Sequence, residues 1–251
     1  MGHWREVSIM SIVINNIDFM YRNKRALADL SCTLVPGFNM LLGPNGAGKS
    51  TLLNLLTAQR PLQRGTINFD GVDIEKTPRQ IMQQLGVVFQ QTTLDLDLSV
   101  FQNLTYFGAL HGIKARVVLE RITPVLTQLG LIERLHDTVR DLNEGHRRRV
   151  EIARCMIHQP RYLLLDEATV GLDVDSRKLI IEHIRLLAQQ QAMTILWTTH
   201  LLDEVQEDDP LYILNHGQLI AQGKCKALLS EHQQDSVFDL YRWLTQPQGL
   251  V

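Results

Sequence analysis

The stretch GPNGAGKSTLLNLL (43–56) decides the fold, because it joins a glycine-rich turn directly to apolar residues at helical spacing. The apolar run FNMLL (38–42) comes just before it and is typical of a short buried strand that stops at Gly43. After the turn, Leu52, Leu53, Leu55 and Leu56 predict a helix with one apolar face. A strand, a loop and a helix therefore follow one another here.

The loop fits the pattern G-x-x-x-x-G-K-[ST], and each residue type in that pattern has a chemical reason. Glycines let backbone N–H groups curl around phosphate oxygens, and the helix N-terminus adds positive potential. The lysine reaches the β- and γ-phosphates, and the hydroxyl binds Mg²⁺. The alternative, a turn that binds nothing, is disfavoured by the strand and helix on either side. The predicted phosphate-binding residues are Gly43, Pro44, Asn45, Gly46, Ala47, Gly48, Lys49, Ser50 and Thr51.

A second motif, YLLLDE (162–167), supplies the acids that phosphate chemistry needs. Its apolar residues predict a buried strand that delivers Asp166 to its carboxyl end, where the Mg²⁺ would lie. Glu167 comes next and can act as a general base toward a water that attacks the γ-phosphate. Taken alone, the motif could equally be a strand that ends in two solvated acids. Its pairing with the upstream lysine and serine favours the catalytic interpretation.

The rest of the chain predicts an α/β fold. Strands separated by a helical stretch at 176–191 indicate a mainly parallel sheet with crossover helices. Helical spacing without β-branched runs from 91 to 159 predicts an inserted α-helical subdomain. Alternating patterns near the N-terminus add an antiparallel β edge. The strand-like segments are 11–21, 27–37, 38–42, 65–74, 85–90, 161–167 and 193–200; a hairpin with a His-Gly turn spans 211–223, and a short amphipathic helix follows at 235–244.

Composition excludes several other classes. The chain has 251 residues, 45% of them hydrophobic, which is enough for one large domain with a substantial core. Its formal net charge of -2 argues against a nucleic-acid-binding protein. The three cysteines show no metal-ligand spacing and fit a reducing compartment. No apolar run is long enough for a membrane span, and the start MGHWREVSIM lacks the apolar region of a signal peptide.

The two motifs, in this order, resemble the ATP-binding subunits of ABC transporters, and the resemblance runs from about residue 11 to 225. It implies that Tyr21 stacks on adenine and that Gln90, which closes VVFQ, senses Mg²⁺ and the attacking water. It further implies that Asp173 ends the D-loop TVGLD and that His200 contacts the γ-phosphate. The metal site would then be Ser50, Gln90 and Asp166. For Tyr21 a plain strand aromatic remains the alternative.

The stretch DLNEGHRRRVEIARC (141–155) stands where the family has its signature, LSGGQ, which contacts the nucleotide held by a second subunit. Gly145 is retained, and Asn143, in place of serine, can still donate through its amide. Glu144 replaces a glycine, and His146 replaces the glutamine. The Glu144 carboxylate would repel the phosphate by about 1 kcal/mol or more. The arginines that follow could form a nucleic-acid patch, but a solvated or ion-paired helix face is favoured.

The resemblance implies a single domain, 11–251, with a core at 11–90 and 160–225, a helical subdomain at 91–159 and a C-terminal helical tail at 226–251. The expected function is ATP binding and hydrolysis that powers a separate membrane-embedded ABC permease. Export is expected, because TTLDLDLSVFQNLTYFGALHG (92–112) resembles ABC-2-type export ATPases. The expected location is cytoplasmic, at the inner face of the cell membrane through the permease.

A second ATPase subunit, identical or different, would complete the site, and no nucleic-acid partner is expected. Two alternatives remain open. One is a soluble ABC ATPase that acts in DNA repair or on ribosomes. The other is a regulatory module that hydrolyses ATP weakly or not at all.

Overall fold

The buried strand that precedes the glycine-rich turn is β3 (Gly37–Leu42), and it lies inside a six-stranded sheet of order β10-β9-β3-β8-β7-β6. The structure, a computed structural model, describes residues 10–245. Residues 1–9 of the start MGHWREVSIM and the last six residues of the predicted tail, 246–251, lie outside this range. The other strands of the sheet are β6 (Leu85–Val88), β7 (Tyr162–Asp166), β8 (Thr194–Thr199), β9 (Pro210–Asn215) and β10 (Gln218–Lys224).

The predicted mainly parallel sheet is confirmed. Strands β6, β7, β8, β3 and β9 pair in parallel, and β10 pairs antiparallel with β9 at the edge. Every residue of β7 and of β8 is buried. Strands covered on both faces read as continuous apolar runs, which is why YLLL and TILW were recognisable as strands.

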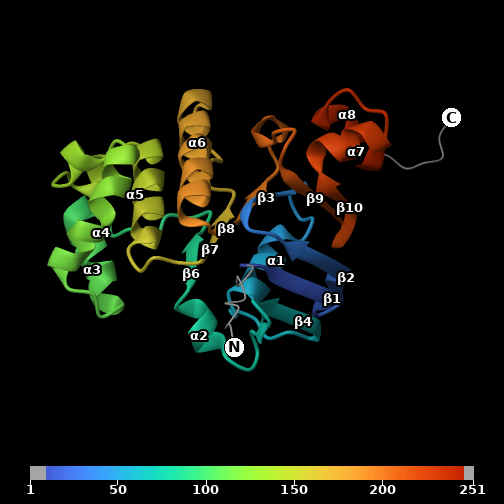
Figure 1. Ribbon diagram of the computed structural model, residues 1–251, viewed down its shortest axis with the longest axis horizontal. Coiled ribbons are helices and arrows are strands. Elements are labelled where there is room, and N and C mark those ends of the chain that lie inside the picture. Colours follow the sequence, from blue (N-terminus) through green and yellow to red (C-terminus); the bar gives the residue numbers. More distant parts are fainter. Residues whose placement is uncertain (1–9, 246–251) are drawn as a thin grey trace, which may run out of the picture.

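The antiparallel strands form a sheet of their own rather than a simple edge of the parallel one. Its order is β2-β1-β4-β5, and β10 alone provides the antiparallel edge of the other sheet. Ile12, Ile14 and Ile17 of β1 are completely buried and belong to one apolar cluster with the leucines of α1. Helix α1 therefore fills the space between the two sheets (Figure 1). The bounds are β1 (Ile12–Tyr21), β2 (Lys24–Leu34), β4 (Arg64–Phe69), β5 (Val72–Asp73) and α1 (Lys49–Leu56).

The predicted helical stretch contains α3 (Val100–Leu110), α4 (Ala115–Gln128) and α5 (Glu144–Met156), which pack together as a lobe at one end of the molecule (Figure 1). Two turns of 3-10 helix, Ile132–Arg134 and Val139–Asp141, join α4 to α5. Ser99 caps α3 in a reciprocal capping box with Gln102. The start of α3 is therefore fixed by its own sequence as well as by the apolar core of the lobe.

The second half of the chain follows the predicted alternation. Helix α6 (Val174–Gln191) crosses from β7 to β8, and a 3-10 turn, Leu202–Glu204, follows β8. Helices α7 (Cys225–Glu231) and α8 (Val237–Thr245) lie in the predicted helical tail. Helix α2 (Pro78–Met82) was not predicted. Among the helices of residues 10–245, none is long and apolar enough to cross a membrane.

The His-Gly turn between β9 and β10 braces the glycine-rich loop. The N–H of Gly217 donates to the carbonyl of Ala47 at 2.8 Å, and the Gly217 carbonyl accepts from the N–H of Ala28 at 2.8 Å. A Cβ at position 217 would lie 2.6 Å from the carbonyl oxygen of Ala26, and φ is +79°. Glycine is therefore required where the hairpin, the loop and β2 meet.

Candidate nucleotide-binding site

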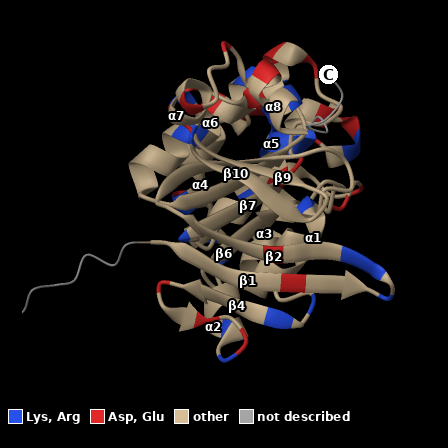
Figure 2. Cartoon of the chain, turned by 90° about the vertical axis from the view of Figure 1, so that its right-hand side faces the viewer, with Lys and Arg blue, Asp and Glu red and all other residues tan. Residues whose placement is uncertain are grey.

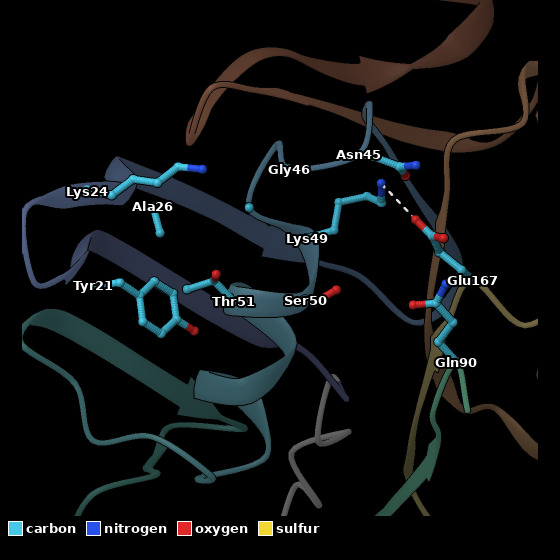
Figure 3. Close-up of a pocket in the computed structure, with 11 residues that line it drawn as sticks. Tyr21, Lys24, Ala26, Asn45, Gly46, Lys49, Ser50, Thr51, Gln90 and Glu167 are labelled. Atoms are coloured by element: carbon cyan, nitrogen blue, oxygen red, sulfur yellow. Dashed lines mark ion pairs between the residues drawn. The ribbon is translucent and has the colours of Figure 1, made fainter. Parts of the chain in front are cut away.

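A cavity of about 450 Å³ opens at the N-terminus of α1 (Figure 3). Four neighbouring parallel strands, β3, β8, β7 and β6, end on this side of the sheet, so residues far apart in sequence meet there. Lining residues come from the β1–β2 hairpin, the glycine-rich loop, and the ends of β6 and β7. They are Tyr21, Lys24, Ala26, Asn45, Gly46, Gly48, Lys49, Ser50, Thr51, Gln90 and Glu167.

The loop needs glycine at two positions, because main-chain atoms of other segments pass close to it there. Gly48 has φ of +116°, and a Cβ there would lie 2.7 Å from the carbonyl oxygen of Ala26. A Cβ at Gly43 would lie 2.4 Å from the carbonyl oxygen of Leu214. Of the nine predicted residues, six line the cavity, whereas Gly43, Pro44 and Ala47 shape the loop from behind.

Lys49 is buried, with 4% of its surface exposed, and its ammonium is held from two sides. Nζ donates to the carbonyls of Gly43 at 2.7 Å and Pro44 at 3.2 Å. It also forms an ion pair with Oε1 of Glu167 at 3.0 Å, drawn as the dashed line in Figure 3. The predicted phosphate-binding lysine and the predicted general base are therefore direct neighbours.

Asp166 lies behind the cavity at the end of β7. Its Oδ1 accepts from the hydroxyl of Thr198 at 2.8 Å. Burial raises the pKa of Asp166, while hydrogen bonds from Thr198 and Ser50 act in the opposite direction. The Ser50 hydroxyl and the Asp166 carboxylate, with the Gln90 amide at the cavity wall, form an oxygen-rich donor set. Such a set fits Mg²⁺, which prefers one or two carboxylates together with phosphate oxygens and water.

Glu167 has an unfavourable backbone conformation for a residue other than glycine. Its φ is 48°, in the left-handed region, at an energetic cost on the order of 1 kcal/mol or more. Its N–H donates to the carbonyl and the hydroxyl of Thr198, both at 3.1 Å, which holds it there. Nδ1 of His200 lies 3.3 Å from Glu167 Oε1, without hydrogen-bond geometry. Adjacent strands β7 and β8 thus hold the acid and the histidine together.

Tyr21 and Gln90 stand at different walls of the cavity. The Tyr21 ring packs edge-on against Phe19, with centroids 4.9 Å apart, and remains 37% exposed. The guanidinium of Arg60 lies 5.6 Å from the Tyr21 centroid. The side chain of Gln90 lines the cavity, and its backbone carbonyl accepts from Arg148 at 2.8 Å.

Sequence reasoning missed Lys24, Ala26, Arg60 and Thr198. Lys24 is exposed near the turn between β1 and β2, where basic residues lie together (Figure 2). It faces the cavity because β2 returns beside β1, and Tyr21 pairs with Lys24 in the register. No local sequence motif predicts that Tyr21 and Lys24 are paired. For Thr198, the threonine pair before His200 was the available signal.

Asn143, Gly145 and Asp173 do not line the cavity. Asn143 caps α5, because its Oδ1 accepts from the N–H of His146 at 2.8 Å. Asp173 caps α6 by accepting from the N–H of Ser176 at 2.9 Å, and these hydrogen bonds lower the pKa of its carboxyl. A Cβ at Gly145 would lie 3.2 Å from Ser176 Oγ. The N-termini of α5 and α6 are therefore neighbours.

The arginines of α5 bind other segments of their own chain. Each of the four donates to a main-chain carbonyl of another segment of the same chain, and Arg148 also forms a buried ion pair with Glu151. The sequence favoured a solvated or ion-paired helix face; Arg148 is ion-paired but buried, and the main partners of these arginines are carbonyls of their own chain. The donor–acceptor pairs are Arg147 to Val139, Arg148 to Phe89, Arg149 to Leu129 and Arg154 to Thr93.

The fold and the cavity define a P-loop nucleotide-binding domain with an inserted helical lobe. The family model for ABC transporters matches residues 27–170. The chain belongs to the ATP-binding proteins of this family, as its resemblance implied, and members are ATPases coupled to transport.

Individual relatives agree with this assignment. The linearmycin resistance ATP-binding protein LnrL of Bacillus subtilis is 34% identical over 90% of this chain and 73% of its own length. The Nod factor export ATP-binding protein I of Sinorhizobium fredii is 36% identical over 94% of this chain and 69% of its own. A solved ATP-binding subunit of an ABC transporter matches the fold with a TM-score of 0.81, at 23% identity, over 94% of this chain and 99% of that one.

Proposed function

We propose that the chain binds MgATP in the cavity at the start of α1, hydrolyses it and thereby powers export through a separate membrane permease. The observation that carries this proposal is the contact of Lys49 with Glu167, with His200 beside it. A phosphate-binding cation, a general base and a histidine lie together at the end of a glycine-rich loop. Phosphoryl transfer to water requires these groups in one place.

Binding of the triphosphate changes the partners of Lys49. Phosphate oxygens that enter the loop compete with the Glu167 carboxylate for the ammonium, and the backbone N–H groups before α1 and the helix N-terminus add to the attraction. Glu167, released from Lys49, accepts the proton of the attacking water. His200 lies where its imidazole can contact the γ-phosphate. Tyr21 offers its exposed ring to the adenine.

The metal would be held by Ser50, Asp166 and Gln90. Mg²⁺ at these oxygens would neutralise charge on the β- and γ-phosphates. Thr198 keeps the Asp166 carboxylate oriented toward the Ser50 side, because its hydroxyl donates to Oδ1. Burial of Asp166, which raises its pKa, leaves a carboxyl group whose charged form gains from a bound cation.

A second ATPase subunit completes the proposed site. Asn143 and Asp173 are exposed and lie outside this chain's own cavity, so they are available to the nucleotide of another subunit, whereas Gly145 is buried beside Ser176. Glu144 is half-exposed at the first turn of α5, and its carboxylate lies 3.9 Å from the Arg147 guanidinium. The arginine offsets part of the carboxylate charge, and the helix N-terminus is a favourable place for an acid. The part of the charge that is not offset would still repel the phosphates of a second nucleotide. We therefore infer that two copies of this chain pair weakly, and that a different subunit with an intact signature is the better partner.

The names of two relatives support a role in export. One is named for resistance to linearmycin and another for Nod factor export, and both names describe ATP-binding proteins. We propose that this chain likewise serves a membrane-embedded permease from the cytoplasmic side of the membrane. Helix α3 and the segment after β6 would transmit closure of the ATP site, and exposed Tyr106 and Leu110 on α3 offer an apolar contact.

The test is steady-state ATP hydrolysis by the purified chain beside Glu167→Gln. The glutamine cannot accept the proton, so kcat should fall by about 10²–10⁴-fold while ATP still binds. Equilibrium binding of a fluorescent ATP analogue measures the second property. Turnover that survives in Glu167→Gln would overturn the assignment of the base. Co-purification with a detergent-solubilised membrane permease tests the partner.

A further inference from the structure

The segment that carries Gln90 is fastened to α5 by a buried ion pair. Arg148 is 3% exposed and Glu151 is 1% exposed, and Nη1 of the arginine lies 2.8 Å from Oε2 of the glutamate. The same guanidinium donates to the carbonyl of Phe89 at 2.6 Å and to the carbonyl of Gln90 at 2.8 Å. One side chain therefore fixes the main chain just before and at the glutamine.

The other side of Gln90 is fixed by the same helix. Oε1 of Glu151 accepts from the N–H of Thr93 at 2.7 Å and from the hydroxyl of Thr92 at 3.1 Å. One turn further along α5, Arg154 donates to the carbonyl of Thr93 at 2.9 Å. The main chain of residues 89–93 is thus held at both ends, while the Gln90 side chain remains exposed at the cavity wall.

Stability alone is a weak reason for this arrangement. Removing two charges from water costs several kcal/mol, and a well-packed apolar pair of similar volume is often as stable. The ion pair instead fixes the orientation of the Arg148 guanidinium. A planar guanidinium presents its N–H groups in a fixed fork, and the carboxylate holds that fork toward the two carbonyls.

We propose that Arg148 and Glu151 are positioning residues for Gln90. They hold its main chain so that the amide faces the nucleotide cavity, and they make it move with α5. Because α5 begins beside Asn143, displacement of that helix end by a second subunit reaches Gln90 directly. This inference rests on the proposed function, since it assigns Gln90 a role in Mg²⁺ and water placement.

The test replaces the pair by two methionines, Arg148→Met with Glu151→Met, which fills the volume without charge. We expect kcat to fall about 10- to 100-fold, because small misplacement of a positioned group has effects of this size. The KM for ATP should stay within about twofold, since Lys49 and the loop are untouched. The Mg²⁺ concentration for half-maximal ATP binding, measured in the Glu167→Gln background, should rise. That second readout does not depend on turnover.

A double-mutant cycle shows whether the pair acts through Gln90. Adding Gln90→Ala to the methionine pair should lower kcat no further than Gln90→Ala alone, because both changes remove the same function. The matched control is Asp209→Asn, which breaks an ion pair between the buried Asp209 and the part-exposed Arg185 of α6. It should lower the melting temperature without changing kcat or the Mg²⁺ dependence.

Three results would overturn the inference. The first is a methionine pair with unchanged kcat and an unchanged Mg²⁺ midpoint. The second is a cycle in which the effects of the pair and of Gln90→Ala multiply. In the third, Asp209→Asn has the same kinetic effect as the methionine pair. Failure of the proposed function is separate, because it would appear as full turnover in Glu167→Gln.

Discussion

At the scale of single residues, Gly48 is the position where one added carbon should do most damage. A Cβ would lie 2.7 Å from the Ala26 carbonyl oxygen and 2.9 Å from a methyl carbon of Leu27, at φ of +116°. We expect Gly48→Ala to displace the loop and to lower ATP affinity at least about tenfold, or 1.4 kcal/mol. Equilibrium titration with ATP measures this.

Gly112→Ala is the matched control for this change. Its φ of +70° is also positive, although it costs alanine less than the +116° of Gly48, and a Cβ there meets no atom within 4 Å. It should reduce stability by about 1 kcal/mol and leave ATP affinity unchanged. Equal loss of affinity in both variants would show that backbone strain, and not the contact with Ala26, controls the loop.

Tyr21 is the residue that is expected to contact the base of the nucleotide. If its ring stacks on adenine, Tyr21→Ala should weaken ATP binding by about 5- to 150-fold, the value of 1–3 kcal/mol for base stacking. Tyr21→Trp should retain the affinity, because an indole offers the same flat face. Unchanged binding by Tyr21→Ala would make it an ordinary strand aromatic packed on Phe19.

Sequence predicted the residues whose position follows from local chain direction. Lys49 follows a buried strand and its glycine-rich loop, and Glu167 comes directly after another buried strand, so the carboxyl edge of the sheet brings them together. Lys24 and Arg60 could not be found in this way. Their proximity to the cavity depends on the register of β1 with β2 and on the return of the chain after α1, which are non-local.

At the scale of elements, the first turn of α5 carries the residues that we propose meet the nucleotide of a second subunit. We expect the triple change Asn143→Ser, Glu144→Gly and His146→Gln to raise ATP turnover of the purified chain, because it removes a carboxylate from the surface offered to a second nucleotide. Serine should still cap α5. Steady-state hydrolysis measures the effect.

The melting temperature separates this effect from folding. Asn143→Ala removes the cap and should lower the free energy of unfolding by about 0.5–2 kcal/mol, whereas the serine variant should stay close to the native chain. If the triple variant is no faster than the native chain, Glu144 does not limit turnover, and the altered signature is fully compatible with self-pairing.

Element types were more predictable than their arrangement. Continuous apolar runs identified β7 and β8, and alternation identified β1. The grouping of β1, β2 and β4 into a separate sheet was not foreseen, because strand pairing is set by packing on α1 and not by any one segment. Helix α2, of five residues, is too short for its periodicity to show.

At the scale of the whole molecule, His158 makes the seam between lobe and core sensitive to acid. Its ring stacks on His111 at the end of α3, with centroids 4.5 Å apart, and its Nε2 lies 3.2 Å from the Leu85 carbonyl of β6. Burial, with a smaller effect from His111, lowers the pKa of His158 from 6.5 to about 4. The unfolded chain therefore takes up a proton at higher pH than the folded chain does.

The sign of the pH dependence follows. Between pH 6.5 and about 4 the unfolded state binds more protons at this residue, so stability falls as the pH falls through that range. His158→Phe should flatten this part of the curve of unfolding free energy against pH. Urea unfolding at several pH values checks it. An unchanged slope in the variant would mean that carboxylates alone account for the acid sensitivity.

The turn at Gly217 bears on how fast the nucleotide can enter. Both backbone polar groups of Gly217 are used: its N–H donates to the Ala47 carbonyl, and its carbonyl accepts from the N–H of Ala28. The loop between them therefore has its receptive shape before any phosphate arrives, and capture needs no slow rearrangement of the chain. A hairpin about 170 residues away in sequence, far outside the motif, should therefore favour fast association and should contain some of the slowest-exchanging amides of the free protein.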